Sequence, residues 1–503
     1  MRYLPTARQM KEADRHTISK LGIPSLELME RAAAGCVKVM KEKRLDLSHV
    51  CIVCGSGNNG GDGFAIGRML LEDGCRVTAV MAGNRERCTD ECREQLRLFE
   101  EAGGIVGNEY SEQEYGVIVD ALFGVGLSRG IEGRYLSLLD AMNRSGAYKF
   151  AVDIPSGVSA DTGNILGAAF HADLTVTFQE KKFGMEVYPG KELSGNVVTA
   201  DIGISRQTLW EDETAVAALE AADYRKLLPA RKEDSHKGTY GKVLVVAGSK
   251  GMCGAAYFNA KAAYRSGAGL VKIYTAEENR PVLQQLLPEA VIASYERFDE
   301  ERLKKQLAWA DVVCMGSGIG TGEAASGHVR TVLTHGGAPC VIDADGLNII
   351  SSDPELAGQL LKGRHVLTPH MKEMSRLAGC SVADIKSDRL KVLKDYTDKT
   401  GAACVLKDSR TLIGMRGERT VLNLSGNSAM AKAGSGDVLA GVIAGFLAQG
   451  AGCYDGAVLG AYIHGRSGDH ARDDKGRYSV MAEDIISQIG IAINECAGRK
   501  TEG

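Results

Sequence analysis

Short apolar runs alternate with amphipathic segments along the whole chain. Runs rich in Val, Ile and Leu predict buried strands, and segments with apolar residues three or four positions apart predict helices that cover a sheet. The strands predicted in the first half are Val50–Cys54, Val77–Met81, Val117–Leu122, Tyr148–Ile154 and Leu174–Phe178. The helices predicted there are Thr6–Lys20, Ser25–Lys43, Asp62–Glu72, Thr89–Glu101 and Tyr135–Ser145. This alternation indicates an open, largely parallel sheet with helices on its faces.

The second half repeats the pattern. Its predicted strands are Val243–Ala247, Leu270–Tyr274, Val312–Met315, Cys340–Ile342, His365–Leu367 and Ala403–Leu406. Glycine loops are missing from the acidic, alanine-rich stretch between Ser205 and Lys237, so we place a domain boundary there. The sequence therefore predicts an α/β protein of two three-layer α/β/α domains, residues 1–214 and 215–503.

Composition narrows the class of protein. A chain of 503 residues is too long for one hydrophobic core. Its net charge of −4 favours neither nucleic acid nor an anionic membrane as a partner. The first residues lack the apolar core of a signal peptide, and the 13 cysteines are scattered through apolar segments, as free thiols would be. We therefore expect a cytoplasmic protein that binds neither nucleic acid nor membranes.

The most informative segment lies close to the C-terminus. The small residues Gly434, Ser435 and Gly436 directly precede the apolar helix predicted over Val438–Leu447. Glycine permits backbone angles that aim successive N–H groups at one point, and a helix start adds positive charge, so the segment predicts a phosphate site. Asp437 could then take a proton from a hydroxyl that receives a phosphoryl group. A flexible turn followed by a helix N-cap remains an alternative.

Three loops of the first half follow predicted strands. Gly55–Gly63 is rich in glycine and in Asn and Asp oxygens, which favour a hydrated sugar, a phosphate or a hard cation. The loops that begin at Asp120 and Asp153 each place a carboxylate at a strand end. Open α/β sheets bind ligands at this edge, so we expect these loops to converge on one site. An ordinary turn for the first loop and helix caps for the two Asp residues remain alternatives.

The first half resembles the NAD(P)H-hydrate epimerase domain. The resemblance rests on N-N-G-G-D-G at Asn58–Gly63, D-A-L-F-G-x-G-L at Asp120–Leu127 and D-I-P-S-G-V-x-A-D-T-G at Asp153–Gly163. It covers nearly all of residues 1–210, includes Lys182 and implies a Rossmann-like fold. The substrate-binding residues that it implies are Asn58, Asn59, Gly60, Gly61, Asp62, Gly124, Val125, Gly126, Leu127, Ser128, Arg129, Gly130 and Asp153. It also implies that Asn59, Asp120 and Ser156 ligate potassium and that Asp153 is the acid/base.

The second half resembles the ADP/ATP-dependent NAD(P)H-hydrate dehydratase, which has a ribokinase-like fold. Ordered motifs carry this resemblance, among them Gly316–Gly320, Asp343–Asn348, Leu367–His370 and Ala433–Gly441. The residues implied to contact the hydrate are Ala255, Gly318, His370 and the catalytic base Asp437. The implied nucleotide-binding residues are Lys407, Asp408, Ser409, Arg410, Thr411, Asn427, Ser428, Ala429, Met430, Ala431, Lys432, Ala433, Gly434, Ser435 and Gly436.

The chemistry fits these assignments. In the first half, a carboxylate that accepts and returns the hydroxyl proton at carbon 6 of the hydrate promotes loss and re-addition of oxygen. In the second half, phosphorylation by ADP turns that hydroxyl into a good leaving group, with magnesium neutralising the transferred charge. Ser317 and Met371 stand where the family usually has Pro, and we expect local loop changes only. His370 could instead be a structural histidine at a strand end.

The leading hypothesis is a bifunctional repair enzyme for hydrated NADH and NADPH (NADHX and NADPHX) that uses ADP, Mg²⁺ and K⁺. An alternative is a ribokinase-like kinase of a vitamin precursor or sugar with a non-catalytic N-terminal binding domain. A scaffold or RNA-binding role for the first half is a third. We expect a homo-oligomer. The residues alone do not decide between ADP and ATP, or between NADHX and NADPHX.

Overall fold

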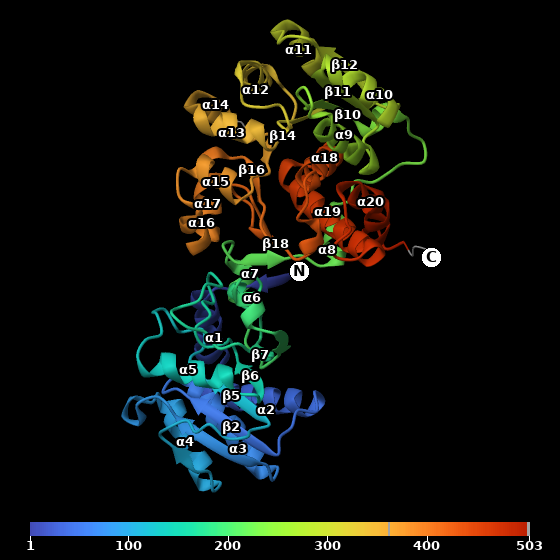
Figure 1. The fold of residues 1–503 in the computed structure, drawn as a ribbon. Coiled ribbons are helices and arrows are strands. Elements are labelled where there is room, and N and C mark those ends of the chain that lie inside the picture. Colours follow the sequence, from blue (N-terminus) through green and yellow to red (C-terminus); the bar gives the residue numbers. More distant parts are fainter. Residues whose placement is uncertain (361–362, 500–503) are drawn as a thin grey trace. The chain divides into compact units, whose positions relative to one another are not determined.

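The computed structural model describes residues 1–360 and 363–499, and they form two compact units. One unit spans Arg2–Val216, and the other spans Ala217–Gly503 together with Met1. Figure 1 shows each unit as a sheet flanked by helices.

The N-terminal unit is built on a parallel sheet in the order β4-β3-β2-β5-β6-β7-β8. Its central strands are buried along their whole length because helices cover both faces. The strands of the unit are β1 (Arg2–Leu4), β2 (His49–Cys54), β3 (Arg76–Met81), β4 (Val106–Gly107), β5 (Val117–Ala121), β6 (Tyr148–Val152), β7 (Leu174–Phe178) and β8 (Asn196–Ala200).

Helices from different parts of the unit cover the two faces. One buried cluster joins α1 to α4 with side chains such as Ile52 and Val119, and a second joins α5 with Val53 and Ile118 on the opposite face. Successive residues of a strand point to opposite faces, so the two clusters define three layers. The helices are α1 (Ala7–Leu21), α2 (Ser25–Glu42), α3 (Asn58–Glu72), α4 (Asp90–Glu101), α5 (Arg134–Arg144), α6 (Gly190–Leu193) and α7 (Gln207–Glu211).

The C-terminal unit has a sheet in the order β9-β18-β17-β16-β15-β14-β13-β10-β11-β12. Only the pairs β16–β17 and β17–β18 of this series are antiparallel. The strands are β9 (Val216–Ala218), β10 (Lys242–Val246), β11 (Leu270–Ala276), β12 (Val291–Tyr295), β13 (Val312–Met315), β14 (Cys340–Ile342), β15 (His365–Leu367), β16 (Ala403–Leu406), β17 (Thr411–Gly414) and β18 (Val421–Asn423).

Helix α18 is apolar and almost wholly buried, and it packs with α9, α19 and α20 on one face of this sheet. On the other face, Leu244 and Val246 of β10 are also buried. The helices of this unit are α8 (Ala221–Leu227), α9 (Cys253–Arg265), α10 (Arg280–Leu286), α11 (Glu300–Leu307), α12 (Glu323–His335), α13 (Asp345–Ser352), α14 (Pro354–Gln359), α15 (Met371–Ala378), α16 (Val382–Ser387), α17 (Arg389–Thr400), α18 (Ser435–Ala448), α19 (Cys453–Lys475) and α20 (Ala482–Cys496).

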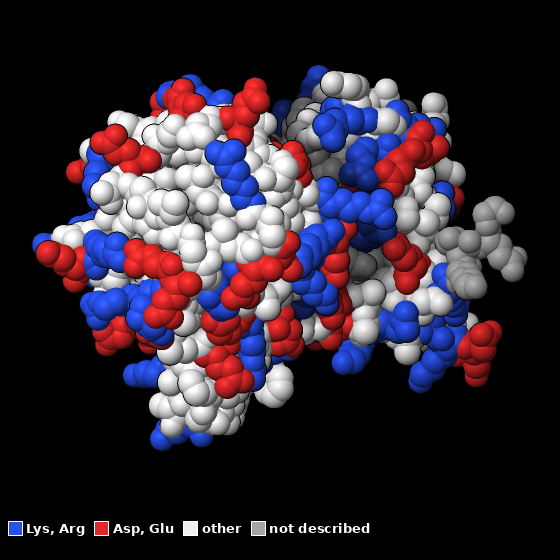
Figure 2. Space-filling model, turned by 90° about the horizontal axis from the view of Figure 1, so that it is seen from below, with Lys and Arg blue, Asp and Glu red and all other residues white. Residues whose placement is uncertain are grey.

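These observations confirm the predicted fold class, with local corrections. Helix α3 begins at Asn58, four residues before the predicted start at Asp62. Strands β1, β4, β8, β9, β12, β17 and β18 were not expected from the pattern. Within residues 1–360 and 363–499, no helix has the length and apolar character needed to cross a bilayer. Acidic and basic side chains are interspersed on the face shown in Figure 2.

Candidate active sites

The first site lies where the strand order of the N-terminal sheet changes direction. Strands β2 and β5 are neighbours, and the chain leaves them toward opposite edges of the sheet. Such a switch point leaves a crevice at the carboxyl ends of the strands. Here Gly55 donates its N–H to the Ala121 carbonyl oxygen at 2.9 Å. A Cβ at Gly55 would lie 2.0 Å from the Leu122 carbonyl oxygen, so only glycine allows this close approach.

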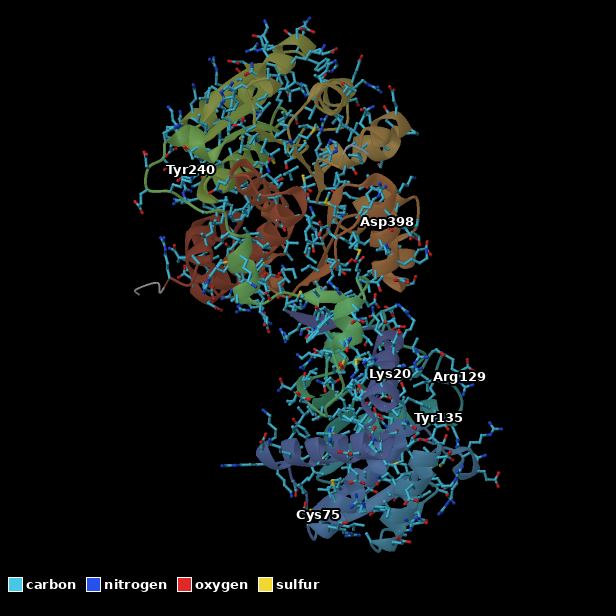
Figure 3. The ribbon with its side chains drawn as sticks, turned by 180° about the vertical axis from the view of Figure 1, so that it is seen from behind. Lys20, Cys75, Arg129, Tyr135, Tyr240 and Asp398 are labelled. Carbon is cyan, nitrogen blue, oxygen red and sulfur yellow. The ribbon has the colours of Figure 1, made fainter. Side chains whose placement is uncertain are left out.

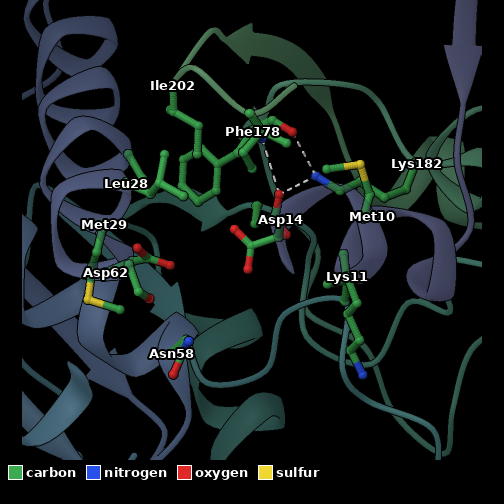
Figure 4. Close-up of a pocket in the computed structure, with 15 residues that line it drawn as sticks. Met10, Lys11, Asp14, Leu28, Met29, Asn58, Asp62, Phe178, Lys182 and Ile202 are labelled. Atoms are coloured by element: carbon green, nitrogen blue, oxygen red, sulfur yellow. Dashed lines mark hydrogen bonds and ion pairs between the residues drawn. The ribbon is translucent and has the colours of Figure 1, made fainter. Parts of the chain in front are cut away.

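A cavity of about 150 Å³ opens beside this point (Figure 4). Polar groups at its wall come from α1, from the start of α3 and from the loops that follow β6 and β7. Its lining residues are Met10, Lys11, Asp14, Ser25, Leu28, Met29, Ala32, Asn58, Asp62, Val125, Asp153, Phe178, Lys182, Ile202 and Ile204.

Asp153 follows β6 in a left-handed conformation, with φ of +66°. This conformation is uncommon for a residue with a side chain, although Asp tolerates it better than most. Carboxylate oxygen Oδ1 accepts hydrogen bonds from the Phe178 N–H and the Thr177 hydroxyl, both at 3.2 Å. The backbone turn and these two donors fix the direction of the carboxylate at the cavity.

Lys182 forms an ion pair with Asp153 and is only 1% exposed. Its ammonium group also donates to the Thr177 hydroxyl at 2.8 Å and to the Phe178 carbonyl oxygen at 3.2 Å. A buried charge requires such partners, and together they hold an ionised carboxylate at the cavity wall. The sequence placed Lys182 in a matching segment without assigning it a role, since its distance from Asp153 depends on the fold.

Asp120 and Ser156 form a second buried polar group at the same sheet edge. The Asp120 carboxylate accepts hydrogen bonds from the Ser156 N–H and hydroxyl, both at 2.7 Å. Burial raises the pKa of Asp120 to about 6, although the bonds from Ser156 oppose this shift. The Asn59 amide lies nearby, since its Oδ1 would be 3.2 Å from a Cβ at Gly124. Its buried Nδ2 has no hydrogen-bond partner in the described part of the chain.

The other predicted residues of this half lie in three places. Asn58, Asp62 and Val125 line the cavity. Gly60 and Gly61 lie inside α3. Glycine disfavours helices, but here a Cβ would clash with the Gly55 carbonyl or with Met29, so the close packing requires glycine. The remaining residues belong to the loop after β5, whose end is exposed (Figure 3, Arg129): Gly124, Gly126, Leu127, Ser128, Arg129 and Gly130. The binding roles of these residues stay predictions.

The second site lies at the corresponding switch point of the C-terminal sheet, between β10 and β13. The loop after β13 contains Gly316 and Gly318, with φ of +111° and +62°. A Cβ at Gly318 would lie 3.1 Å from the Ala255 Cβ, so the structure brings these two predicted contacts together. The loops after β14, β15 and β16 reach the same edge with Asp343, Thr368 and Lys407.

Asp437 lies in the first turn of α18, after Gly434 with φ of +88°. Burial raises the pKa of Asp437 to about 6, and the charge of Asp343 adds to this effect while that of Lys407 opposes it. The Asn259 side chain donates to the Asp437 carbonyl oxygen at 2.7 Å and so anchors the turn to α9. A carboxyl with this pKa exchanges a proton readily near neutral pH.

Lys407 connects the sheet edge with the glycine segment. Its ammonium group bonds Asp343 Oδ1 at 2.8 Å, and the Thr368 hydroxyl donates to the same oxygen at 2.8 Å. A Cβ at Gly436 would lie 3.3 Å from this ammonium group and 3.5 Å from Asp343 Oδ2. A lysine, a helix N-terminus and a glycine turn thus face one point, which is the arrangement that binds phosphate. The sequence motif contained Asp343, but no role followed from it.

Other predicted nucleotide contacts have structural partners. Asp408 pairs with Arg389 at 3.5 Å, and Arg410 donates to the Leu424 carbonyl oxygen at 2.9 Å. Asn427 donates to Asp469 at 2.9 Å and caps the short 3₁₀ helix Ser428–Met430. Ser409 and Thr411 lie at the turn into β17, and Ala431, Lys432 and Ala433 are exposed between that helix and α18. Their nucleotide-binding roles stay predictions.

His370 is the N-cap of α15. Its Nδ1 accepts hydrogen bonds from the Lys372 and Glu373 N–H groups at 3.1 and 3.3 Å. The structural role left open above is therefore present, and the ring Nε2 lies 3.2 Å from Glu373 Oε1, while the side chain remains 49% exposed. Burial lowers the pKa of His370, and the charge of Lys407 lowers it further, which favours the neutral imidazole.

Comparisons with known proteins match both halves of the chain to known families. A family profile described as NAD(P)H-hydrate dehydratase matches residues 243–490, and one described as YjeF-related protein N-terminus matches residues 25–184. A ribokinase-like superfamily protein of Enterococcus faecalis is 28% identical and covers 56% of this chain and 96% of its own, with a TM-score of 0.51.

Curated relatives align with both units at once. The bifunctional NAD(P)H-hydrate repair enzyme Nnr of Moorella thermoacetica is 36% identical over 96% of this chain and 95% of its own. The enzyme of the same name from Escherichia coli is 32% identical over 97% of this chain and 93% of its own. The chain belongs to the family of bifunctional NAD(P)H-hydrate repair enzymes.

Proposed function

We propose that the N-terminal unit interconverts the R and S epimers of NADHX and NADPHX, and that the C-terminal unit dehydrates the S epimer with ADP. The observation that carries this proposal is the pair of separate carboxylate sites. Asp153 is paired with Lys182 in one unit, and Asp437 lies beside the Lys407–Asp343 pair in the other. The products of the second reaction would be NAD(P)H, AMP and phosphate.

In the C-terminal unit, Asp437 removes the proton of the carbon-6 hydroxyl while that oxygen attacks the phosphoryl group. The N–H groups at the start of α18 and the Lys407 ammonium group stabilise the phosphate charge. Asp343 keeps Lys407 aimed at this point. Phosphate is a far better leaving group than hydroxide, so elimination of phosphate then restores the dihydronicotinamide ring.

Two cations belong to the proposal. Potassium fits the oxygens of Asn59, Asp120 and Ser156, because the buried Asp120 carboxyl has no cationic partner among the described residues. It would supply positive charge beside the loop that follows β5. Magnesium would be held by Asp343 Oδ2, which accepts no hydrogen bond within the described residues, and it would neutralise charge on the transferred phosphoryl group.

Purified protein would be mixed with both epimers of NADHX, magnesium and either ADP or ATP, and the absorbance of restored NADH followed. Conversion of both epimers with ADP supports the whole proposal. Conversion of only one epimer would contradict the epimerase activity. Formation of a stable phosphorylated product would favour the small-molecule kinase. We expect Asp437→Asn to abolish dehydration only and Asp153→Asn to abolish epimerisation only.

The cellular setting is also a proposal. All 13 cysteines are free, which is consistent with a reducing compartment such as the cytoplasm. Self-association stays a prediction, and size-exclusion chromatography with light scattering would measure it.

A further inference from the structure

The cavity of the N-terminal unit contains more carboxyl groups than one acid/base residue requires. Asp14 from α1 and Asp62 from α3 line it together with Asp153 (Figure 4). Among the described residues, neither Asp14 nor Asp62 has a hydrogen bond or an ion pair, whereas Asp153 is paired with Lys182. The only other lysine of the lining, Lys11, is exposed, and its ammonium group points away from Lys182 in Figure 4.

Because the cavity has so little positive charge, its carboxyl groups differ in how strongly they bind a proton. Burial raises the pKa of Asp14, and the charges of Glu91 and Asp153 raise it further. Burial raises the pKa of Asp62 well above its usual range, with smaller contributions from Asp153 and Asp14. The cavity thus holds one carboxyl group paired with a lysine and two whose raised pKa favours the protonated form. In many enzyme sites, neighbouring carboxyl groups whose environments give them different proton affinities take separate roles as acid and base.

Epimerisation at carbon 6 needs both roles. Hydroxide leaves poorly, so the departing oxygen must receive a proton, and the returning water must give one up. A single carboxylate held in an ion pair can act as the base but has no proton to donate. A second group is therefore required, and it must be close to Asp153.

We propose that Asp14 is a second catalytic residue of the epimerase site, donating a proton to the departing carbon-6 oxygen while Asp153 accepts one from the returning water. The inference rests on the epimerase function proposed above. The Asp14 O–H bond breaks as its proton joins the oxygen, the C6–O bond breaks, and the ring nitrogen lone pair forms a C6=N1 bond. Water then adds to the opposite side of carbon 6, its proton passes to Asp153, and the electron pair returns to nitrogen.

Each turnover balances, and proton exchange with water restores Asp14 and Asp153 before the next turnover in the same direction. One turnover moves one proton from Asp14 to Asp153, and the reverse reaction, starting from the other epimer, moves it back with the two roles exchanged. Each protonation form of the site thus accepts one epimer.

Helix α1 is held firmly where this role requires it. The Ala7 N–H donates to Asp161 at 2.6 Å, and the Phe183 N–H, next to Lys182, donates to the Pro5 carbonyl oxygen at 3.1 Å. One turn beyond Asp14, the Thr17 hydroxyl accepts a hydrogen bond from the Ser205 N–H at 2.9 Å. The helix that carries Asp14 is therefore tied to the segment that carries Lys182.

Asp14 is better suited to proton transfer than Asp62. Burial raises the pKa of both groups but raises that of Asp62 further above its usual range, so Asp14 gives up a proton more readily than Asp62. We assign Asp62 the role of a hydrogen-bond donor. Besides burial, the charges that raise the pKa of Asp14 are those of Glu91 from α4 and Asp153 after β6. Asp62 from α3, Lys182 after β7 and Lys11 on the same helix line the same cavity.

The test compares wild type with Asp14→Asn, Asp62→Asn and Asp153→Asn in the full chain. Interconversion of the separated NADHX epimers would be followed by chromatography between pH 5 and 9. We expect Asp14→Asn to lower kcat by about 10²-fold or more, with KM little changed. Wild-type kcat should fall at high pH as Asp14 loses its proton, and this alkaline fall should be missing from Asp14→Asn but present in Asp62→Asn.

Dehydratase activity and melting temperature of each preparation show that the variant is folded. If wild type does not interconvert the epimers, the proposed function itself fails. If wild type does so and Asp153→Asn does not, an Asp14→Asn variant with wild-type kcat and alkaline fall overturns the role of Asp14 alone. Loss of the alkaline fall in Asp62→Asn instead of Asp14→Asn would move the acid to Asp62 and equally overturn the inference.

Discussion

Replacing the proposed base of the dehydratase site should make the protein more stable. Asp437 has a pKa of about 6 in the fold, against 3.8 for the unconstrained carboxyl. A difference of about two units corresponds to about 3 kcal/mol, by which the ionised form is disfavoured in the folded state. Because the folded pKa is raised, this cost is fully present above pH 6 and disappears as the pH falls below about 4. Asp437→Asn removes the charge and almost preserves the shape.

We therefore expect the free energy of unfolding of Asp437→Asn to exceed that of wild type by up to about 3 kcal/mol at pH 7.5. This gain should vanish near pH 4. Urea unfolding of the ligand-free full chain, followed through the transition of the C-terminal unit, would measure it. Asp395→Asn is the matched control, since this carboxylate is 63% exposed and its loss should change stability by under about 0.5 kcal/mol at any pH. A variant no more stable than wild type at pH 7.5, or a gain that grows toward low pH, would refute the reasoning.

Three further predictions concern the N-terminal unit. Lys182→Met should abolish epimerisation and lower the free energy of unfolding by about 3–5 kcal/mol, because it leaves a buried carboxylate without its cation; urea unfolding tests this. Gly60→Ala would place a Cβ 2.0 Å from the Gly55 carbonyl oxygen and should cost about 1–3 kcal/mol, whereas Gly57→Ala, with open space around it, should be tolerated in the same assay. Stimulation of epimerase activity by potassium should weaken below pH 6, because the Asp120 carboxyl, with its pKa of about 6, is then protonated; titrations with potassium at pH 5.5 and 7.5 would show whether it does.

The sequence was sufficient for the fold class because its strongest signals were the buried parallel strands. Strands β17 and β18 were missed because they are only four and three residues long, too short for a clear apolar run, although they pair with strands close by in the sequence. The predicted start of helix α3 was four residues too late, because glycine disfavours helices. Close packing requires glycine at several positions of this helix: Gly60 against Gly55, Gly61 against Met29, and Gly63 against Ala121.

The candidate sites were predictable to the extent that motifs carried them. Asp153 and Asp437 stand in ordered motifs, and the structure places each at the carboxyl edge of its sheet. Asp14 lies in an amphipathic helix, where one acidic residue looks like any solvated charge, and nothing local connects it to Asp153. Lys182 was visible only as part of a matching segment. Both depend on distances between segments far apart in sequence, which patterns do not encode.

The left-handed backbone at Asp153 also limits how this position can evolve. Gly, Asn and Asp adopt such a conformation with the least strain, whereas a longer or branched side chain costs about 1–3 kcal/mol. A single base change converts an Asp codon into one for Asn or Gly. Among the residues that one base change reaches, Asn and Gly are therefore the two that keep the turn with the least strain and remove the carboxylate. Lineages that no longer need epimerisation can lose it here in one step while the domain stays folded.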